Sequence, residues 1–296
     1  MVEPTVESAS PTVLKWWIAA ELRRLREAGG CTRRQAAERL GKATAQIGHL
    51  ETGRNLPTAA DLEVLLTCYG VPRRVELFRD LLHQAKRGRD WWSDYTDAMH
   101  GSLGLLLGLE ALAAQIHGYH AVLVPEILQA PSYAEAVIHG GDLVGPDPAG
   151  PDHQVARRVE LRMARQQILF GRDEPPQLFA VLDEGVLHRQ VGGPQVLGEQ
   201  LNRLVELAEY PNIDIRVLPT TAAACTVAAA FTWLTFSPEL ENDHGVVHVE
   251  TLTCNNYYDK PVDVLSYRHA LTTLRAHALS SAESVLLIER IAKELT

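Results

Sequence analysis

Apolar residues recur at helical spacing through the first 90 residues, and no stretch there alternates apolar and polar positions as a strand does. The stripes predict five helices. Three of them cover about residues 12–28, 32–40 and 44–51, with glycines or threonines at their ends. A fourth begins after Thr58, and a fifth carries the last stripe. That stripe consists of Val75, Phe78, Leu81, Leu82 and Ala85. The pattern predicts a compact, mainly α bundle.

Beyond residue 90 the pattern changes, and helical stripes are mixed with short apolar runs. Helices are expected over residues 154–169 and 195–209 and near the end of the chain. Four runs have the length and composition of strands: residues 178–182, 213–218, 231–236 and 245–252. This part is therefore predicted to be a larger α+β domain with a small sheet.

Residues 33–50, RRQAAERLGKATAQIGHL, combine features that two short helices crossing at a tight turn require. Ala37 stands where the helices approach most closely, and Gly41 stands where the turn needs a positive φ. Apolar contacts are expected from Ala36, Leu40, Ile47 and Leu50. The combination predicts a helix-turn-helix. For the chain as a whole we expect a disordered tail over residues 1–10, a helix-turn-helix domain over 11–90 and the α+β domain over 91–296.

The charges divide the chain in the same way. Residues 11–90 hold 15 Lys+Arg against 9 Asp+Glu, a net of +6, whereas residues 91–296 hold 13 against 26, a net of −13. A basic module attracts phosphates, while an acidic remainder discourages indiscriminate adhesion to DNA or anionic lipid. Chance asymmetry between two ordinary domains would give the same numbers, so charge alone does not decide the function.

Several classes of protein are disfavoured by the sequence. The first ten residues lack the basic and apolar pattern of a secretory signal, and no stretch has the roughly 18 uncharged apolar residues of a membrane span. We expect a soluble, cytoplasmic protein. The four cysteines, Cys31, Cys68, Cys225 and Cys254, form no zinc motif and are expected to be reduced and mostly buried.

The segment LRRLREAGGCTRRQAAERLGKATAQIGHLETGRNLP resembles the N-terminal module of Xre-type, phage-repressor-like regulators. The resemblance implies that residues 44–51 form the recognition helix in the major groove of double-stranded DNA. The positions that match base-reading residues are Thr44, Ala45, Gln46 and His49. The positions that match phosphate contacts are Arg33, Lys42 and Arg54.

The same resemblance implies an ion pair between Arg26 and Glu51 that ties the recognition helix to the first helix. Two positions depart from the family pattern. Many members have glutamine where Arg33 stands and a polar residue where Gly48 stands. Gly48 costs about 1 kcal/mol of helix stability relative to alanine, and it removes one possible DNA contact. The operator sequence cannot be predicted from this helix.

Further segments, among them LVPEILQAPSYAEAV and RRVELRMARQQIL, resemble the uncharacterised domain of actinobacterial WhiJ-like regulators. The resemblance implies transcriptional control, often with a small partner protein encoded nearby. It implies no cofactor and no catalytic residue. A single recognition helix reads few base pairs, so a homodimer is expected.

The second domain also carries groups that can be read as chemistry. Asp243, His244, His248, Glu250 and Cys254 include metal-ligating types, but two histidines four apart on a strand stand about 13 Å apart. Asp183, Glu184 and His188 can imitate an acid/base group, without a recognisable nucleophile. Arg158, Arg162 and Arg165 share a helical face that fits an anionic ligand, a partner or simply solvent.

We therefore predict a DNA-binding transcriptional regulator that is not an enzyme. Its second domain either senses a small-molecule effector or partner protein or only dimerises the chain. The alternative is an enzyme or ligand-binding protein with an appended DNA-binding module.

Overall fold

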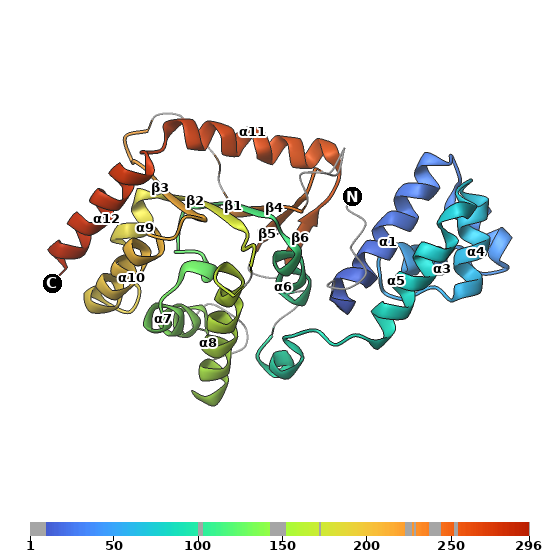
Figure 1. Cartoon of the computed structure of the whole chain (residues 1–296), viewed down its shortest axis with the longest axis horizontal. Coiled ribbons are helices and arrows are strands. Elements are labelled where there is room, and N and C mark those ends of the chain that lie inside the picture. Colours follow the sequence, from blue (N-terminus) through green and yellow to red (C-terminus); the bar gives the residue numbers. More distant parts are fainter. Residues whose placement is uncertain are drawn as a thin grey trace. The chain divides into compact units, whose positions relative to one another are not determined.

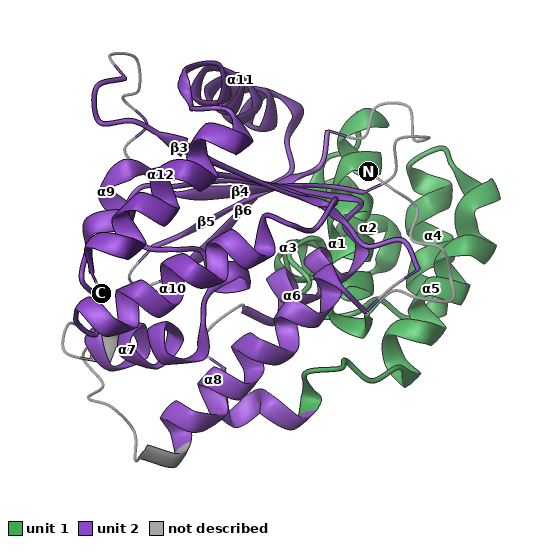
Figure 2. Ribbon diagram, turned by 60° about the vertical axis from the view of Figure 1, so that its left-hand side comes forward, with its two compact units in different colours: residues 1–93 green, residues 94–296 purple. Residues whose placement is uncertain are grey.

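The computed structural model describes residues 10–99, 103–142, 152–171, 173–222, 227, 229–236, 244–251 and 254–295. The chain divides into two compact units, residues 1–93 and 94–296 (Figure 2). The predicted disordered tail lies outside the described residues except for Ser10, whose hydroxyl accepts a hydrogen bond from the Val13 amide and caps the first helix.

The first unit is the predicted bundle of five α-helices (Figure 1). They are α1 (Pro11–Ala28), α2 (Arg33–Leu40), α3 (Thr44–Glu51), α4 (Ala59–Cys68) and α5 (Val75–Arg87), with a 3₁₀ turn, η1 (Pro72–Arg74), before α5. Thr32 and Thr58 cap α2 and α4, and each forms a capping box with the residue three positions on. The sequence pattern placed these helices correctly because their caps are local signals.

The core of this unit gathers the predicted stripes. Ile18 and Leu22 of α1 pack with Ile47 of α3, Leu66 of α4 and Phe78 of α5, and all five are almost completely buried. Each such side chain contributes about 1.5–3 kcal/mol when buried. This core holds α2 and α3 against the rest of the bundle.

The second unit is built on a six-stranded mixed sheet in the order β3-β2-β1-β4-β5-β6. Its strands are β1 (Gln115–His120), β2 (Gln177–Asp183), β3 (Ile213–Leu218), β4 (Phe231–Thr235), β5 (Val246–Glu250) and β6 (Asn255–Tyr258). β1, β2 and β3 are parallel, whereas β4, β5 and β6 follow antiparallel. The four predicted strands are present. β1 and β6 were missed because QIHGYH and NNYY are not apolar runs.

Helices cover both faces of this sheet (Figures 1 and 2). One face carries α6 (Leu103–Leu112), α7 (Pro131–Asp142), α8 (Asp152–Gln166) and α10 (Pro194–Leu207), and the other carries α11 (Pro261–His277). Shorter helical turns are η2 (Ser93–Ala98), η3 (Glu126–Leu128), η4 (Gln167–Leu169) and α9 (Glu184–His188). The predicted α+β architecture is confirmed, with a larger sheet than the four apolar runs suggested.

The last helix, α12 (Ser281–Glu294), protects the outer strand. The Val217 amide of β3 donates to the Ser284 hydroxyl over 2.9 Å, and the Leu279 amide donates to the Val217 carbonyl over 2.9 Å. An edge strand left open would offer these groups to another chain. The C-terminal segment therefore satisfies the β3 edge at Val217.

The helices and the cysteines bear on two of the expectations from the sequence. Among the described residues, the helices are all too short or too polar to cross a membrane. Cys31 and Cys68 are only half-buried, and Cys254 is exposed, so the expectation of mostly buried cysteines is wrong for these three. Cys225 lies outside the described residues.

Candidate nucleic-acid interface

The turn between α2 and α3 is built by its small residues. Gly41 has a φ of +63°, the left-handed conformation predicted for it, and its amide donates to the Glu38 carbonyl. Ala36 and Ala37 are buried where the helices pack. An added Cβ at Gly41 would meet no atom within 4 Å, so conformation and not space requires glycine there.

Helix α3 has one buried face and one open face. Ile47 and Leu50 point into the core, whereas Thr44, Ala45 and Gln46 are exposed and His49 is half-buried. Successive residues of a helix are about 100° apart, so the four predicted base-reading residues surround the open side. The structure thus presents Thr44, Ala45, Gln46 and His49 together on the solvent side of α3.

The first turn of α3 lacks a side-chain cap. Ala43 occupies the N-cap position in extended conformation and makes no side-chain hydrogen bond. The amides of this turn therefore keep the partial positive charge of a helix N-terminus, which favours an anion such as phosphate. By contrast, Thr32 caps the preceding helix, α2, with its side chain.

The three predicted phosphate contacts differ in how free they are. The Arg33 Nε donates to a Glu51 carboxylate oxygen over 2.8 Å, although 47% of the Arg33 side chain is exposed. The Lys42 ammonium lies 2.7 Å from both carboxylate oxygens of Asp61. Exposed Arg54 lies 3.5 Å, Nη1 to Nε2, from His49.

Asp61 is a residue that the sequence reasoning missed. Its carboxylate accepts the Thr58 amide in the α4 capping box as well as the Lys42 ammonium. Burial raises the pKa of Asp61, but Lys42 and Thr58 outweigh burial and hold the pKa below its usual value. Lys42 is thus already paired, and a phosphate has to compete with Asp61 for it.

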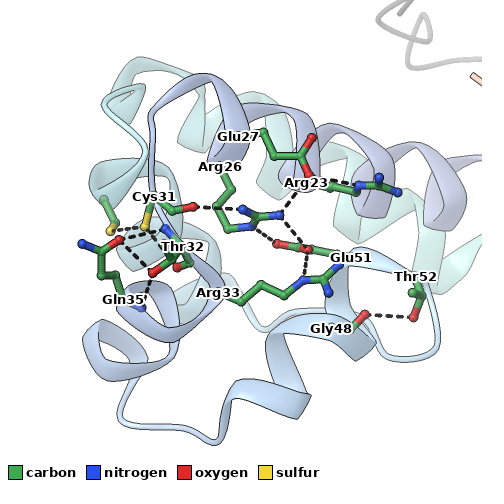
Figure 3. Close-up of polar contacts among 11 residues, drawn as sticks. Arg23, Arg26, Glu27, Cys31, Thr32, Arg33, Gln35, Gly48, Glu51 and Thr52 are labelled. Carbon is green, nitrogen blue, oxygen red and sulfur yellow. Dashed lines mark hydrogen bonds and ion pairs between the residues drawn. The ribbon is translucent and has the colours of Figure 1, made fainter. Parts of the chain in front are cut away.

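Glu51 joins two arginines at the end of α3 (Figure 3). Arg26 of α1 donates from Nε to Glu51 Oε1 over 2.5 Å, and Arg33 of α2 donates to Glu51 Oε2. Arg26 also donates to the Cys31 carbonyl over 2.9 Å. The pairing of Arg26 with Glu51 therefore exists in this structure, extended by Arg33, and it connects three helices of the motif.

Helix α2 carries further basic residues that the sequence reasoning did not single out. Arg34 and Arg39 are exposed, and Arg34 lies 3.7 Å from Glu38. Over residues 31–55 there are five basic side chains and two acidic ones, a net of +3. The basic residues are Arg33, Arg34, Arg39, Lys42 and Arg54. A segment with this excess of positive charge attracts a polyanion.

The arginines proposed as a face of the second domain are buried or only partly accessible to solvent. Arg165 of α8 is buried and forms a bidentate pair with Glu110, 2.6 Å for each contact. Arg162 lies 2.8 Å from Glu126, and Arg158 is half-buried. A solvated face is therefore wrong for Arg165, and docking of a large partner on these three side chains is disfavoured.

Two of the three residues considered as an acid/base group, Asp183 and Glu184, have structural hydrogen-bond partners. Asp183 caps α9 by accepting the Gly185 amide, and Glu184 accepts the Thr220 amide over 2.7 Å. His188 approaches Glu184 only to 3.9 Å. These contacts hold α9 and the end of β3 in place.

Of the residues considered for a metal, four lie within the described ranges: His244, His248, Glu250 and Cys254. His248 of β5 lies 2.8 Å, Nε2 to Oδ1, from Asn255 of β6, and His244 stands before β5. Cys254 lies near Thr251, and Asp243 lies outside the described residues. Within the described ranges, groups of three or more His, Cys, Asp or Glu side chains arranged to hold a metal ion are not found.

Comparison with protein families identifies both parts of the chain. A helix-turn-helix domain matches residues 17–78, and a domain of unknown function, DUF5753, matches residues 103–290. Neither the curated proteins nor the solved structures gave a match. The helix-turn-helix match indicates DNA binding and, with it, transcription regulation as the general function. The second match covers more than half of the chain, which therefore belongs to the DUF5753 family and carries a helix-turn-helix domain ahead of the family's own domain.

Proposed function

We propose that the protein is a sequence-specific transcriptional regulator that reads double-stranded DNA with α3 in the major groove. The observation that carries the proposal is the open side of α3. Thr44, Ala45, Gln46 and His49 lie on it, the first turn has no side-chain cap, and exposed Arg54 lies 3.5 Å from His49. A helix presented in this way has the size and charge that the major groove admits.

Each exposed side chain of α3 has a role in this proposal. Gln46 exchanges hydrogen bonds with a base edge, Ala45 packs on a thymine methyl, and Thr44 bonds to a base or a phosphate. His49 donates to guanine N7 or to phosphate. Arg33 and Arg54 contact phosphates with the donors that their internal partners leave open, and Lys42 does so in exchange for Asp61.

We infer that the regulator acts as a homodimer. One recognition helix contacts too few base pairs to select a site in a genome, and two modules related by a two-fold axis read two half-sites about one helical turn apart or a multiple of it. Size-exclusion chromatography with light scattering tests this inference. A monomer both alone and on DNA contradicts it.

For the second domain we propose a sensing role without catalysis. The sequence resembles Xre-type and WhiJ-like actinobacterial regulators, in which such a domain accompanies transcriptional control, and a small effector or a small partner protein would act through it. The absence of catalysis is a proposal too, supported by the structural roles of Asp183 and Glu184. Turnover of any molecule bound by this domain would contradict it.

Selection from a library of random DNA duplexes tests the proposed function. We expect the full chain to enrich a short motif in two copies at a fixed spacing, and footprinting to protect both half-sites. Enrichment of no motif at moderate salt, by a protein shown to be folded, contradicts sequence-specific reading.

A further inference from the structure

A cavity of about 500 Å³ lies in the second domain, between one face of the sheet and helices α6 and α8. Its floor contains Gly118 of β1 with Ala180 and Thr232 as its direct neighbours on β2 and β4. The ring of His120 lies over Gly118, where an added Cβ would collide with it, and Ala180 and Thr232 carry short side chains beside it. The chain that follows β1, residues 122–127, forms a wall, so the cavity lies at the carboxyl end of a parallel strand, where open α/β sheets bind ligands.

Much of the cavity lining consists of apolar side chains that are buried in the core. The buried apolar side chains that face the cavity include Leu106, Ile116, Val124, Ile127 and Leu178. A space of this size with a few polar groups at defined places is typical of small-molecule sites. The rim is marked by exposed residues, among them Val122, Glu250 and Thr251.

The two arginines that line the cavity are already neutralised. Arg165 holds Glu110 with two hydrogen bonds, and it also pairs with Glu126. Arg162 pairs with the other oxygen of Glu126 and donates to the Gln129 side chain over 2.8 Å. Both guanidinium groups are thus used by two carboxylates of the same wall.

A third carboxylate is left over. Glu250, the last residue of β5, lines the cavity, and its carboxylate makes no hydrogen bond or ion pair among the described residues. Partial desolvation and the charge of Glu126 raise the pKa of Glu250. A cation bound beside this carboxylate would relieve both effects, so Glu250 gains more from a cation than a paired carboxylate does.

The two histidines of the cavity do not supply the missing positive charge. Burial, together with the nearby Arg165, lowers the pKa of His120 to about 4 and also lowers the pKa of His248. Both rings are therefore neutral near pH 7, and a neutral imidazole has a nitrogen that accepts a hydrogen bond. The His120 ring makes no hydrogen bond among the described residues.

We propose that this cavity binds a small organic cation, an apolar body that carries a protonated amine, with the amine held by Glu250 and His120. The lining holds three carboxylates against two arginines, with both histidines neutral. An anionic ligand would have to displace Glu126 or Glu110 from the arginines. The charge of the lining therefore selects an amine over a carboxylate of the same shape.

Three probes with one carbon skeleton test the proposal on the full chain: tryptamine, the neutral tryptophol and the anion indole-3-propionate. Binding is followed by ligand-observed NMR and calorimetry near pH 7. We expect tryptamine to bind with a Kd of about 1 mM or tighter, as a ligand of this size can reach. The alcohol and the acid should bind at least about tenfold more weakly, since they lack the charge that Glu250 pairs with.

Variants locate the site and separate charge from folding. Glu250→Gln should remove the preference for tryptamine over tryptophol, while Glu209→Gln, an exposed position on the chain after α10, should leave it unchanged. Thr232→Leu places a larger side chain on the floor and should weaken all three probes, with circular dichroism showing that the fold is kept. Absence of tryptamine binding, preference for the acid, or binding that neither Glu250→Gln nor Thr232→Leu alters overturns the proposal.

That such a ligand controls transcription rests on the proposed function, whereas its binding does not. The probe experiments contain no DNA, so a failure of DNA recognition leaves their outcome intact. Conversely, wild-type protein that enriches an operator but ignores tryptamine would keep the proposed function and reject the amine site.

Discussion

At the scale of single residues, Glu51 is the acid shared by two arginines in the helix-turn-helix. It is almost completely buried and pairs with Arg26 and Arg33 (Figure 3). Removing one partner of a buried pair leaves the other charges uncompensated. The resulting loss of stability is larger than the net stabilisation that the pair provides. The residue therefore fixes the end of α3 and does not read bases.

Glu51→Gln should lower the free energy of unfolding of the N-terminal unit by about 3 kcal/mol. The matched control is Glu38→Gln, because Glu38 is exposed and forms only a loose pair with Arg34; its effect should stay below about 0.5 kcal/mol. Denaturant unfolding followed by circular dichroism measures both. Equal, small effects would show that Glu51 does not hold the helices together.

His117 of β1 predicts how stability depends on pH. Its ring stacks between Phe179 and Trp233, each 4.8 Å away, and burial, aided by the charge of Arg275, lowers its pKa from 6.5 to about 4. Between these values the unfolded chain takes up a proton that the folded chain refuses. Stability is thus unaffected above pH 6.5 and falls as the pH drops toward 4.

His117→Phe should keep the stacking and remove this linkage. The loss of unfolding free energy from pH 7 to pH 5 should be smaller in the variant by about 2 kcal/mol, since one proton is worth about 1.4 kcal/mol per pH unit. His188→Gln, at an exposed position, serves as the control. An unchanged pH dependence in His117→Phe would mean that this histidine is charged in the folded protein.

At the scale of elements, two glycines of the helix-turn-helix have opposite roles. Gly41 adopts a left-handed conformation at the turn, whereas Gly48 lies inside α3 with open space where its Cβ would be. Alanine strains the first position and favours the helix at the second. Comparing Gly41 with Gly48 therefore separates the effect of backbone conformation from the effect of the space available for a side chain.

Gly41→Ala should destabilise the N-terminal unit by about 1 kcal/mol, and Gly48→Ala should stabilise it by up to about 1 kcal/mol. Thermal unfolding of the two variants beside wild type measures both signs. The same direction of change in both variants would contradict the roles assigned to these glycines.

The sequence was sufficient for elements whose signals are local. Thr32, Gly41 and Thr58 mark helix ends, so the bundle could be predicted closely. β1 could not be predicted, because Gly118 and two histidines give it no apolar run, and its place between β2 and β4 depends on pairings far along the chain. The partners of Lys42 and Arg165 were unpredictable for the same reason: Asp61 and Glu110 become neighbours only in the folded structure.

At the scale of the whole molecule, a basic helix-turn-helix unit and an acidic DUF5753 domain share one chain. The net charge of −9 hides a first part of +6, and only the first part contains the open α3. In the proposed function, counterion release makes DNA binding weaken steeply with salt, while base contacts of α3 determine which sequence is bound. Salt dependence and sequence preference are therefore separable.

The most direct test titrates wild type and the Gln46→Ala, His49→Ala double variant against the selected operator and a scrambled duplex over a series of salt concentrations. We expect wild type to prefer the operator at every salt concentration and both proteins to lose affinity steeply with salt. The double variant should bind both duplexes with the weak affinity of wild type for the scrambled one. An operator preference that survives the double substitution would contradict the central claim that α3 reads the DNA.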